Sequence, residues 1–366
     1  MKIAILTQPL SGNYGGILQN YALQIILKRM GHKPYTLHYY KRSVPISLML
    51  EWIKYIIKCV IRHPNRIYRP TFTLKNIVLN RYNGVAPFIQ KYITTTYPMR
   101  AINRRVAEVY GFDAYIVGSD QTWRPMYNRG DRLNYMFLSF LKDVNKTKKI
   151  SYAASFGVDN WEYSEEQTAV CQRLIEKFDS ISVREASGVD LCKNYLDVQA
   201  EHVLDPTLLL SADDYRSLIK GKDFSFRGEV CAYILDMTDE KRKLIDNFCN
   251  RNKLRWFQIG KHLKNGDVPS VESWIAGFDN AKYVITDSFH GSVFSIIFNK
   301  PFISIGNDAR GMSRFNSLLG LFSLEDRLVS SSENIESITT PNWDFVNKTL
   351  SKWQERSINY LKSNLK

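Results

Sequence analysis

Hydrophobic and polar positions along the first forty residues follow the order of a βαβ unit. Lys2–Thr7 has the apolar run of a short buried strand, and a flexible glycine-rich turn is expected at Ser11–Gly16. Ile17–Met30 places apolar residues at helical spacing and stops before Gly31, which predicts a helix. Tyr35–Tyr39 is expected to form the second strand. This order of elements predicts the opening of a parallel sheet.

Alternating strand and helix patterns return in two longer series. The first predicts elements at Ala114–Val117, Lys149–Ala154, Glu165–Phe178, Ser180–Val183 and Ser187–Tyr195. The second follows a break at Asp205-Pro206 and predicts elements at Val230–Leu235, Asp239–Asn252, Leu254–Ile259, Val271–Phe278, Tyr283–Thr286, His290–Phe298 and Pro301–Ile305. An α/β protein with two Rossmann-like domains facing a central cleft is therefore expected, with domains at residues 1–210 and 211–340. The polar stretch 341–366 is expected to form a helix that returns to the first domain.

One segment breaks this alternation. Pro45–Arg62 carries an apolar stripe at helical spacing beside a polar stripe, and basic residues flank it, which predicts an amphipathic helix. Two interpretations stay open. The helix packs on the protein's own core, which is the commoner arrangement, or it lies at a membrane surface with Trp52 at the level of the lipid headgroups.

Composition narrows the class of protein. The 366 residues are 44% hydrophobic and 13% aromatic, which excludes a disordered chain, a collagen-like chain and a small disulfide scaffold. Five scattered cysteines without metal-ligand spacing predict reduced thiols and no zinc site. No stretch suits a signal-peptide core or a membrane span, so a cytoplasmic protein is expected. The net charge of +14 favours an anionic partner, but the scattered basic residues argue against nucleic acid.

The first candidate site is the glycine-rich segment Gly12–Gly16. Its glycines permit close approach of the backbone to a ligand, and the following helix offers free N–H groups to an anion. The pattern is not GxGxxG, which disfavours a nicotinamide or flavin cofactor, and a plain strand-to-helix turn is the alternative. The second candidate is Asp120, which emerges at the carboxyl end of a predicted strand. It suits a general base or a hydroxyl-binding acid, or else it caps the next turn.

A cation and a histidine occupy equivalent strand-end positions. Arg184 follows a predicted strand, where its guanidinium either holds a phosphate or carboxylate or pairs with Glu185. His290 lies in the first turn of an apolar helix, a setting that favours proton transfer over the alternative of a hydrogen-bonded core residue. Three arginines lie further downstream, and one of them is expected to hold an anion, with Arg314 ranked before Arg310 and Arg327.

These segments carry a family resemblance. The motifs are GNYGGILQNYAL (12–23), VGSDQTW (117–123), SYAASFG (151–157), SVRE (182–185), VLDPTLLL (203–210) and TDSFHGSVFSIIFNKPFISIG (286–306). Together, in this order and over about 300 residues, they resemble the polysaccharide pyruvyl transferase family. The resemblance implies a GT-B-like fold and transfer of pyruvate from phosphoenolpyruvate to a sugar of a bacterial surface polysaccharide. The product is a ketal, and phosphate is released.

The resemblance also implies roles for individual residues. Asp120 matches the family's acid, Arg184 its phosphoenolpyruvate-binding arginine and His290 its catalytic histidine. We expect His290 to protonate the methylene carbon as general acid, and Asp120 to orient or deprotonate the acceptor hydroxyl. The donor site is expected to comprise Arg184, Ser288, Phe289, Gly291, Ser292 and Arg314. The acceptor site is expected to comprise Asn13, Tyr14, Gly15, Gly16, Gln121 and Trp123.

Partners and alternatives follow from the same comparison. Neither a cofactor nor a metal is expected, because phosphoenolpyruvate is a co-substrate and no carboxylate cluster suits a divalent cation. A polyprenyl-diphosphate-linked acceptor would place the protein at the inner face of the cytoplasmic membrane, which the basic segment Pro45–Arg62 favours. Two other functions stay open. One is a glycosyltransferase that uses a nucleotide-sugar donor, and the other is a non-catalytic protein that binds anionic glycans.

Overall fold

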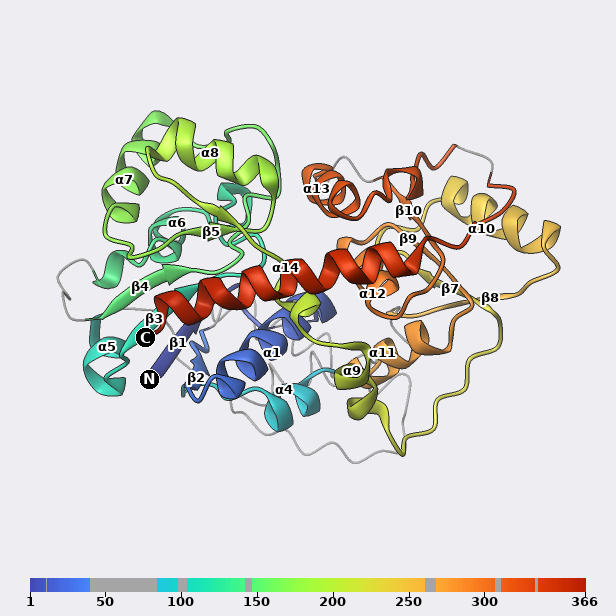
Figure 1. The fold of residues 1–366 in the computed structure, drawn as a ribbon, viewed down its shortest axis with the longest axis horizontal. Coiled ribbons are helices and arrows are strands. Elements are labelled where there is room, and N and C mark those ends of the chain that lie inside the picture. The colour runs from blue at the N-terminus through green and yellow to red at the C-terminus, as the bar shows by residue number, and fades with distance from the viewer. Residues whose placement is uncertain are drawn as a thin grey trace, which may run out of the picture.

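A computed structural model describes residues 1–10, 12–39, 84–97, 104–141, 147–260, 268–306, 311–332 and 335–366. Figure 1 shows two α/β units side by side, with a long C-terminal helix running across both. We call the elements from β1 to η3 the N-terminal half and those from α9 to β11 the C-terminal half. The segment Pro45–Arg62, with its predicted amphipathic helix, lies outside the described residues.

The N-terminal half is built on a parallel four-stranded sheet in the order β2-β1-β3-β4. Isolated bridges join β4 to the short parallel pair β5-β6. The two central strands, β1 and β3, are mostly apolar and buried, which suits the interior of a parallel sheet. The strands are β1 (Lys2–Leu6), β2 (Lys33–Thr36), β3 (Ala114–Val117), β4 (Lys148–Ser151), β5 (Ser182–Val183) and β6 (Glu201–His202).

Helices and short helical turns cover this sheet. The helices are α1 (Tyr14–Arg29), α4 (Ala86–Tyr92), α5 (Arg104–Tyr110), α6 (Asp131–Met136), α7 (Glu165–Ile175) and α8 (Ala186–Leu196). The turns are η1 (Pro125–Tyr127), η2 (Ser139–Leu141) and η3 (Pro206–Leu209). Side chains cap several of them. Asn13 accepts from the backbone N–H of Gly16 at the start of α1, and Ser164 forms a capping box at α7.

The C-terminal half repeats the architecture with a parallel five-stranded sheet in the order β11-β10-β9-β7-β8. Its strands are β7 (Val230–Tyr233), β8 (Trp256–Gln258), β9 (Tyr283–Thr286), β10 (Phe302–Ile305) and β11 (Leu328–Val329). Its helical elements are α9 (Ala212–Ile219), α10 (Asp239–Arg251), α11 (Val271–Asn280), α12 (Phe289–Ile297), α13 (Ser313–Phe322) and η5 (Glu325–Arg327).

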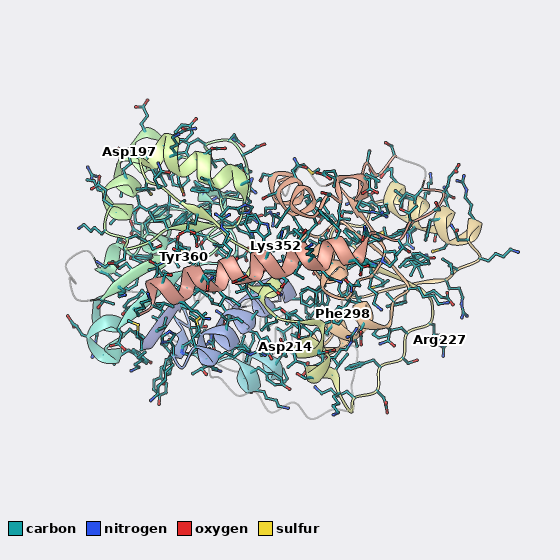
Figure 2. All side chains as sticks on the ribbon, viewed as in Figure 1. Asp197, Asp214, Arg227, Phe298, Lys352 and Tyr360 are labelled. Carbon is teal, nitrogen blue, oxygen red and sulfur yellow. The ribbon has the colours of Figure 1, made fainter. Side chains whose placement is uncertain are left out.

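The two halves share one hydrophobic core, which contains Leu18 of α1 together with Trp274 of α11 and Phe294 of α12. Tyr14 stacks on Trp274 with ring centroids 5.7 Å apart and donates to the carbonyl of Pro269. Arg29 pairs with Asp214, which is labelled in Figure 2. These contacts hold the N-terminal half against the C-terminal half.

The last helix, α14 (Trp343–Asn364), crosses from one half to the other (Figure 1). Tyr360, labelled in Figure 2, donates its hydroxyl to the carbonyl of Ser151 at the end of β4. Ser357 accepts from the backbone N–H of Leu204, and Lys148 donates to the carbonyl of Asn364. The C-terminal helix is therefore bound to the sheet of the N-terminal half.

Most strands and helices predicted from periodicity are present, with ends that differ by a few residues. One prediction is wrong: Tyr14, Gly15 and Gly16 belong to the first turn of α1 and not to a flexible turn. The helix starts early because Asn13 caps it. The second strand is also displaced, since β2 lies at Lys33–Thr36 instead of Tyr35–Tyr39.

Two further findings concern membrane-spanning helices and the cysteines. No helix in the described part of the chain is long and apolar enough to cross a membrane. The cysteines that the structure describes are free and buried: Cys171, Cys192, Cys231 and Cys249. Burial raises the pKa of each of these thiols, so they pack as small apolar side chains.

Candidate active site

The carboxyl ends of strands from both halves lie at the junction between them. Asp120 follows β3, Arg184 follows β5 directly, and His290 is the second residue of the helix that follows β9. In doubly wound folds this edge of a sheet is where ligands bind, because loops and helix N-termini converge there. The sequence-based positions of these three residues at strand ends are confirmed.

Arg184 is a buried cation with a dense set of partners. Its guanidinium donates to Asp205 Oδ2 at 3.0 Å and to Ser155 Oγ at 2.9 Å, and it lies 3.5 Å from Glu185 Oε1. Burial disfavours the charge, but Glu185, Asp205 and Asp120 outweigh that penalty and raise the pKa of Arg184. The group therefore remains a cation inside the protein.

Asp205 was not among the predicted site residues, although it lies in the break at Asp205-Pro206 and in the segment VLDPTLLL. Its carboxylate is buried at the start of η3, where Oδ1 accepts from the backbone N–H and hydroxyl of Thr207. Oδ2 accepts from Arg184 and from Gln19 of α1. Burial alone would raise its pKa, but His290, Arg184 and Thr207 hold the pKa of Asp205 well below its usual range. Its sequence signals are the Asp-x-Thr spacing of a capped turn and its place in the segment VLDPTLLL.

His290 lies between the two halves. Its Nε2 is 3.7 Å from Asp205 Oδ2. On the other side, Gly15 is so close that a Cβ added there would stand 2.0 Å from Nδ1. Only glycine at position 15 leaves room for the imidazole in this position.

A second buried arginine completes the basic side of the site. Arg314 lies in the first turn of α13, and its guanidinium is 5.6 Å from the centroid of the Phe289 ring. The guanidinium of Arg184 lies 4.8 Å from the same centroid. Burial and the neighbouring charge of Arg184 lower the pKa of Arg314 to about 10. Arg314 therefore joins the cluster, whereas Arg327 bonds to Thr339 and Arg310 lies outside the described residues.

Asp120 faces the first turn of α1. It adopts a left-handed backbone conformation with φ of 60°, and its Oδ1 accepts from the N–H of Gln121 at 2.8 Å. Its Oδ2 would lie 3.4 Å from a Cβ on Gly16. Consecutive glycines of one helical turn thus lie against Asp120 from the N-terminal half and His290 from the C-terminal half.

The remaining predicted acceptor residues have other contacts. Asn13 caps α1, and the hydroxyl of Tyr14 bonds to Pro269. Gln121 accepts from Arg124, with its Oε1 against Gly157. Trp123 is fully buried in the N-terminal half and donates to the carbonyl of Met136. The structure does not bring the indole of Trp123 to the cluster.

Of the predicted donor residues in and before α12, some lie at the arginine cluster and others pack the helix against its sheet. Phe289 is central, since both guanidinium groups lie against its ring. Ser288 precedes the helix as its N-cap and is buried, but its side chain makes no capping bond. A Cβ on Gly291 would stand 2.0 Å from Thr286 Oγ1, and Ser292 bonds to Ser304 at 2.6 Å. The last two residues therefore pack α12 against its own sheet.

A second ion pair, also missed from the sequence, fixes the start of α12. Asp287 is buried and accepts from Lys241 Nζ at 2.7 Å. It also accepts from the backbone N–H groups of Leu235 and Asp236 in the loop after β7. Asp287 lies immediately before Ser288, the N-cap of α12. These bonds therefore fix the position of the first turn of α12, which carries His290.

The site combines two buried cations, a histidine and carboxylates that belong to different elements. Within the described residues, no group of three or more His, Cys, Asp or Glu side chains is arranged to hold a metal ion. Two guanidinium groups suit a ligand with two anionic groups, and the histidine and Asp120 suit proton transfer. Asp205 and Glu185 already neutralise part of the positive charge.

Comparisons with known proteins fit this geometry. A family model described as polysaccharide pyruvyl transferase matches residues 13–309, which include Asp120, Arg184 and His290. No curated protein matches the sequence. Among solved structures, UGT89C1 of Arabidopsis thaliana complexed with UDP-L-rhamnose has a TM-score of 0.50 at 8% identity, covering 98% of this chain and 97% of that one.

One bacterial and one archaeal structure are also similar to this chain. MurG of Acinetobacter baumannii has a TM-score of 0.46 at 8% identity, covering 99% of each chain. UDP-GlcNAc 2-epimerase of Methanocaldococcus jannaschii has a TM-score of 0.47 at 11% identity, covering 99% of this chain and 100% of that one. The likeness to the plant enzyme shows the fold alone. The predicted arrangement of two Rossmann-like domains in a GT-B-like fold is confirmed.

Proposed function

We propose that this chain, which belongs to the polysaccharide pyruvyl transferase family, transfers pyruvate from phosphoenolpyruvate to a sugar of a surface polysaccharide or its lipid-linked precursor. One observation carries the choice of donor: Arg184 and Arg314, both buried, lie against the same Phe289 ring. Asp205 and Glu185 neutralise Arg184 in part, and a ligand with two anionic groups would add interactions with both guanidinium groups. Phosphoenolpyruvate brings a carboxylate and a phosphate on neighbouring atoms, which suits two guanidinium forks.

The chemistry requires one acid and one base. His290 donates a proton to the methylene carbon of phosphoenolpyruvate, and the electrons of the C=C bond form the new C–H bond. A sugar hydroxyl then adds to the central carbon and gives its proton to Asp120. Phosphate leaves with the electrons of its C–O bond. A second hydroxyl forms the other C–O bond, which closes the ketal, and its proton goes to the released phosphate. The proton taken up by Asp120 replaces the one that His290 gave to the methylene carbon.

The positions of the two proton-transfer groups support this assignment. His290 lies at the N-terminus of α12 with Nδ1 toward Gly15. Asp120 lies against the next residue of the same turn, Gly16. The proposed acid and base therefore border one short stretch of backbone, which is where an acceptor hydroxyl and the donor carbon would have to meet.

Calorimetry with phosphoenolpyruvate tests the donor. Native protein is expected to bind it, and Arg184→Lys, which keeps the charge but loses the bidentate fork, is expected to bind at least tenfold more weakly. Arg184→Ala should abolish binding. Arg327→Lys is the matched control, because Arg327 is a buried arginine bonded to Thr339. Binding of a nucleotide sugar in place of phosphoenolpyruvate would contradict the proposed donor and support a glycosyltransferase.

Transfer itself is followed as phosphate release from phosphoenolpyruvate, with p-nitrophenyl glycosides as acceptor probes. Phosphate release that depends on one glycoside, with a product heavier by one pyruvate minus water, is the expected result. His290→Ala should lower the rate by ~10²–10⁴, the usual contribution of a positioned acid. A rate within a few-fold of native would remove His290 from the mechanism.

Contact with a membrane surface is part of the same proposal. A lipid-linked acceptor would lie at the inner leaflet, and the basic pattern of Pro45–Arg62 suits an anionic surface. Native protein is expected to bind liposomes containing anionic lipid, and charge reversal of Lys54, Lys58 and Arg62 to prevent it. Binding that survives the charge reversal would contradict this interpretation.

A further inference from the structure

Asp205 connects the two groups of the site that come from different halves. It bonds to Arg184 of the N-terminal half at 3.0 Å, and its same oxygen, Oδ2, lies 3.7 Å from Nε2 of His290 in the C-terminal half. His290 Nε2 is buried and makes no hydrogen bond in the part of the chain that the structure describes, and Asp205 lies at ion-pair distance from it. The carboxylate that lies near this nitrogen belongs to a side chain only 1% exposed.

The carboxylate of Asp205 cannot turn away from His290 without losing other bonds. Its Oδ1 is held by the N–H of Thr207 at 3.0 Å and by the hydroxyl of Thr207 at 2.6 Å. Gln19 and Arg184 hold Oδ2. The bonds to both oxygens therefore fix the carboxylate with Oδ2 directed toward the unbonded Nε2 of His290.

We propose that Asp205 is a positioning residue for His290, an inference that rests on the proposed pyruvyl transfer. The carboxylate binds Nε2–H of the imidazole, as an acidic residue orients a catalytic histidine in other proton-transfer sites. Nδ1 is then the nitrogen that gives its proton to the methylene carbon. After transfer the neutral ring keeps its proton on Nε2, and Nδ1 recovers one from the proton released by the acceptor hydroxyl. Nδ1 already points to the α1 turn that borders Asp120.

A matched pair of variants isolates this role. Asp205→Asn and Glu185→Gln each remove one negative charge beside Arg184, at 3.0 Å and 3.5 Å respectively. Only Asp205 also faces His290. An effect on kcat or on the histidine tautomer that both variants share is therefore due to the lost charge beside Arg184. An effect seen only in Asp205→Asn is due to the lost contact with His290.

The first readout is ¹⁵N NMR of histidine-labelled full-length protein without substrate, with His290→Gln to assign the signal. The neutral ring of His290 is expected as a single tautomer protonated on Nε2 in native protein and in Glu185→Gln. A mixture of tautomers is expected in Asp205→Asn. An unchanged tautomer in Asp205→Asn would overturn the proposal. Since no substrate is present, this result does not depend on the reaction catalysed.

The second readout is the rate of phosphate release from phosphoenolpyruvate with the glycoside probes. Asp205→Asn is expected to lower kcat by about 10² or more, and at least tenfold beyond Glu185→Gln, while Asp205→Glu restores part of the loss. Equal kcat in the two charge-removing variants would overturn the positioning role. Should Asp205→Asn not fold, Thr207→Val keeps the charge and the backbone bond to Oδ1 but removes the hydroxyl bond, and it is expected to give the tautomer mixture in milder form. A native tautomer in Thr207→Val would then count against the proposal. If native protein shows the tautomer but no transfer, the proposed reaction fails and the Asp205–His290 contact stands.

Discussion

Gly15 lies directly against the imidazole of His290, so that a Cβ at position 15 would stand 2.0 Å from Nδ1 and 2.4 Å from Cγ. The glycine belongs to α1 of the N-terminal half and the histidine to α12 of the C-terminal half. The candidate site is therefore formed only when the two halves are docked, and the backbone of α1 is one of its walls. This explains why the first turn of α1 has a glycine, Gly15, where it contacts the histidine.

Gly15→Ala is expected to displace the imidazole, because no side chain fits beside it. A displacement of about 1 Å in a reacting group typically costs on the order of 10² in rate. Gly16→Ala is the comparison on the Asp120 side, and a smaller loss of rate is expected, since its Cβ would meet Asn13 Nδ2 at 3.2 Å and Asp120 Oδ2 at 3.4 Å, contacts that small shifts relieve. Rates of phosphate release and melting temperatures should be measured together. Equal rates in the two variants would argue against the placement of His290.

Arg314 gives a prediction about anions. Since burial and the charge of Arg184 lower the folded pKa of Arg314 to about 10, while an unfolded arginine keeps its ordinary pKa, the buried cation opposes folding at pH 7. Arg314→Met is therefore expected to leave the melting temperature without anion equal to native or higher. Inorganic phosphate should raise the melting temperature of native protein and not that of Arg314→Met.

Arg327→Met is the control for the phosphate experiment. Arg327 is also buried, but it bonds to the carbonyl and hydroxyl of Thr339, so its loss should lower stability and leave the phosphate response intact. A phosphate response that persists in Arg314→Met would place the anion elsewhere. The comparison thus separates a cation that serves a ligand from one that serves the fold.

The proposed reaction also predicts independence from metal ions. Every step moves protons between side chains and substrates, and guanidinium groups neutralise the phosphate in place of a divalent cation. The rate of phosphate release with excess EDTA is expected to equal the untreated rate. A loss restored by Mg²⁺ or Mn²⁺ would show that the guanidinium groups are not sufficient.

The sequence predicted the carboxyl end of each strand, and this was enough to place Asp120, Arg184 and His290 at strand ends. A strand followed by a polar residue and a helix puts that residue at the carboxyl edge of the sheet whatever the tertiary details. Side-chain direction was not predictable in the same way. Trp123 lies only three residues after Asp120, yet it turns into the core and stacks on Phe137.

Contacts between the two halves could not be predicted from local sequence patterns. The role of Asp205 depends on Arg184, twenty-one positions earlier, and on His290, which belongs to the other half. Arg314 could be ranked above its neighbours but not paired with Phe289, because the sharing of that ring with Arg184 is a result of docking. Periodicity reports on one element at a time, whereas these relationships belong to pairs of elements.

The last prediction concerns acid stability and follows from the ionised, buried carboxylate of Asp205. Its folded pKa lies well below its usual range, because His290, Arg184 and Thr207 together outweigh the effect of burial. The stabilisation is therefore present above the unfolded carboxyl pKa of about 3.9 and is lost as the pH falls toward the folded pKa. At pH 5, Asp205→Asn is expected to lower the free energy of unfolding by about 3 kcal/mol, as for a broken buried ion pair.

Between pH 5 and pH 3 the difference in free energy of unfolding between native protein and Asp205→Asn should become smaller. Native protein loses the stabilisation by the ionised carboxylate, which the variant lacks at both pH values. Urea unfolding of both proteins at the two pH values measures it. Asp213→Asn is the control: its side chain is 87% exposed in a surface pair with Arg216, so its effect should stay below about 1 kcal/mol. A difference for Asp205→Asn that is equally large at pH 3 would mean that the carboxylate is not held ionised by its partners.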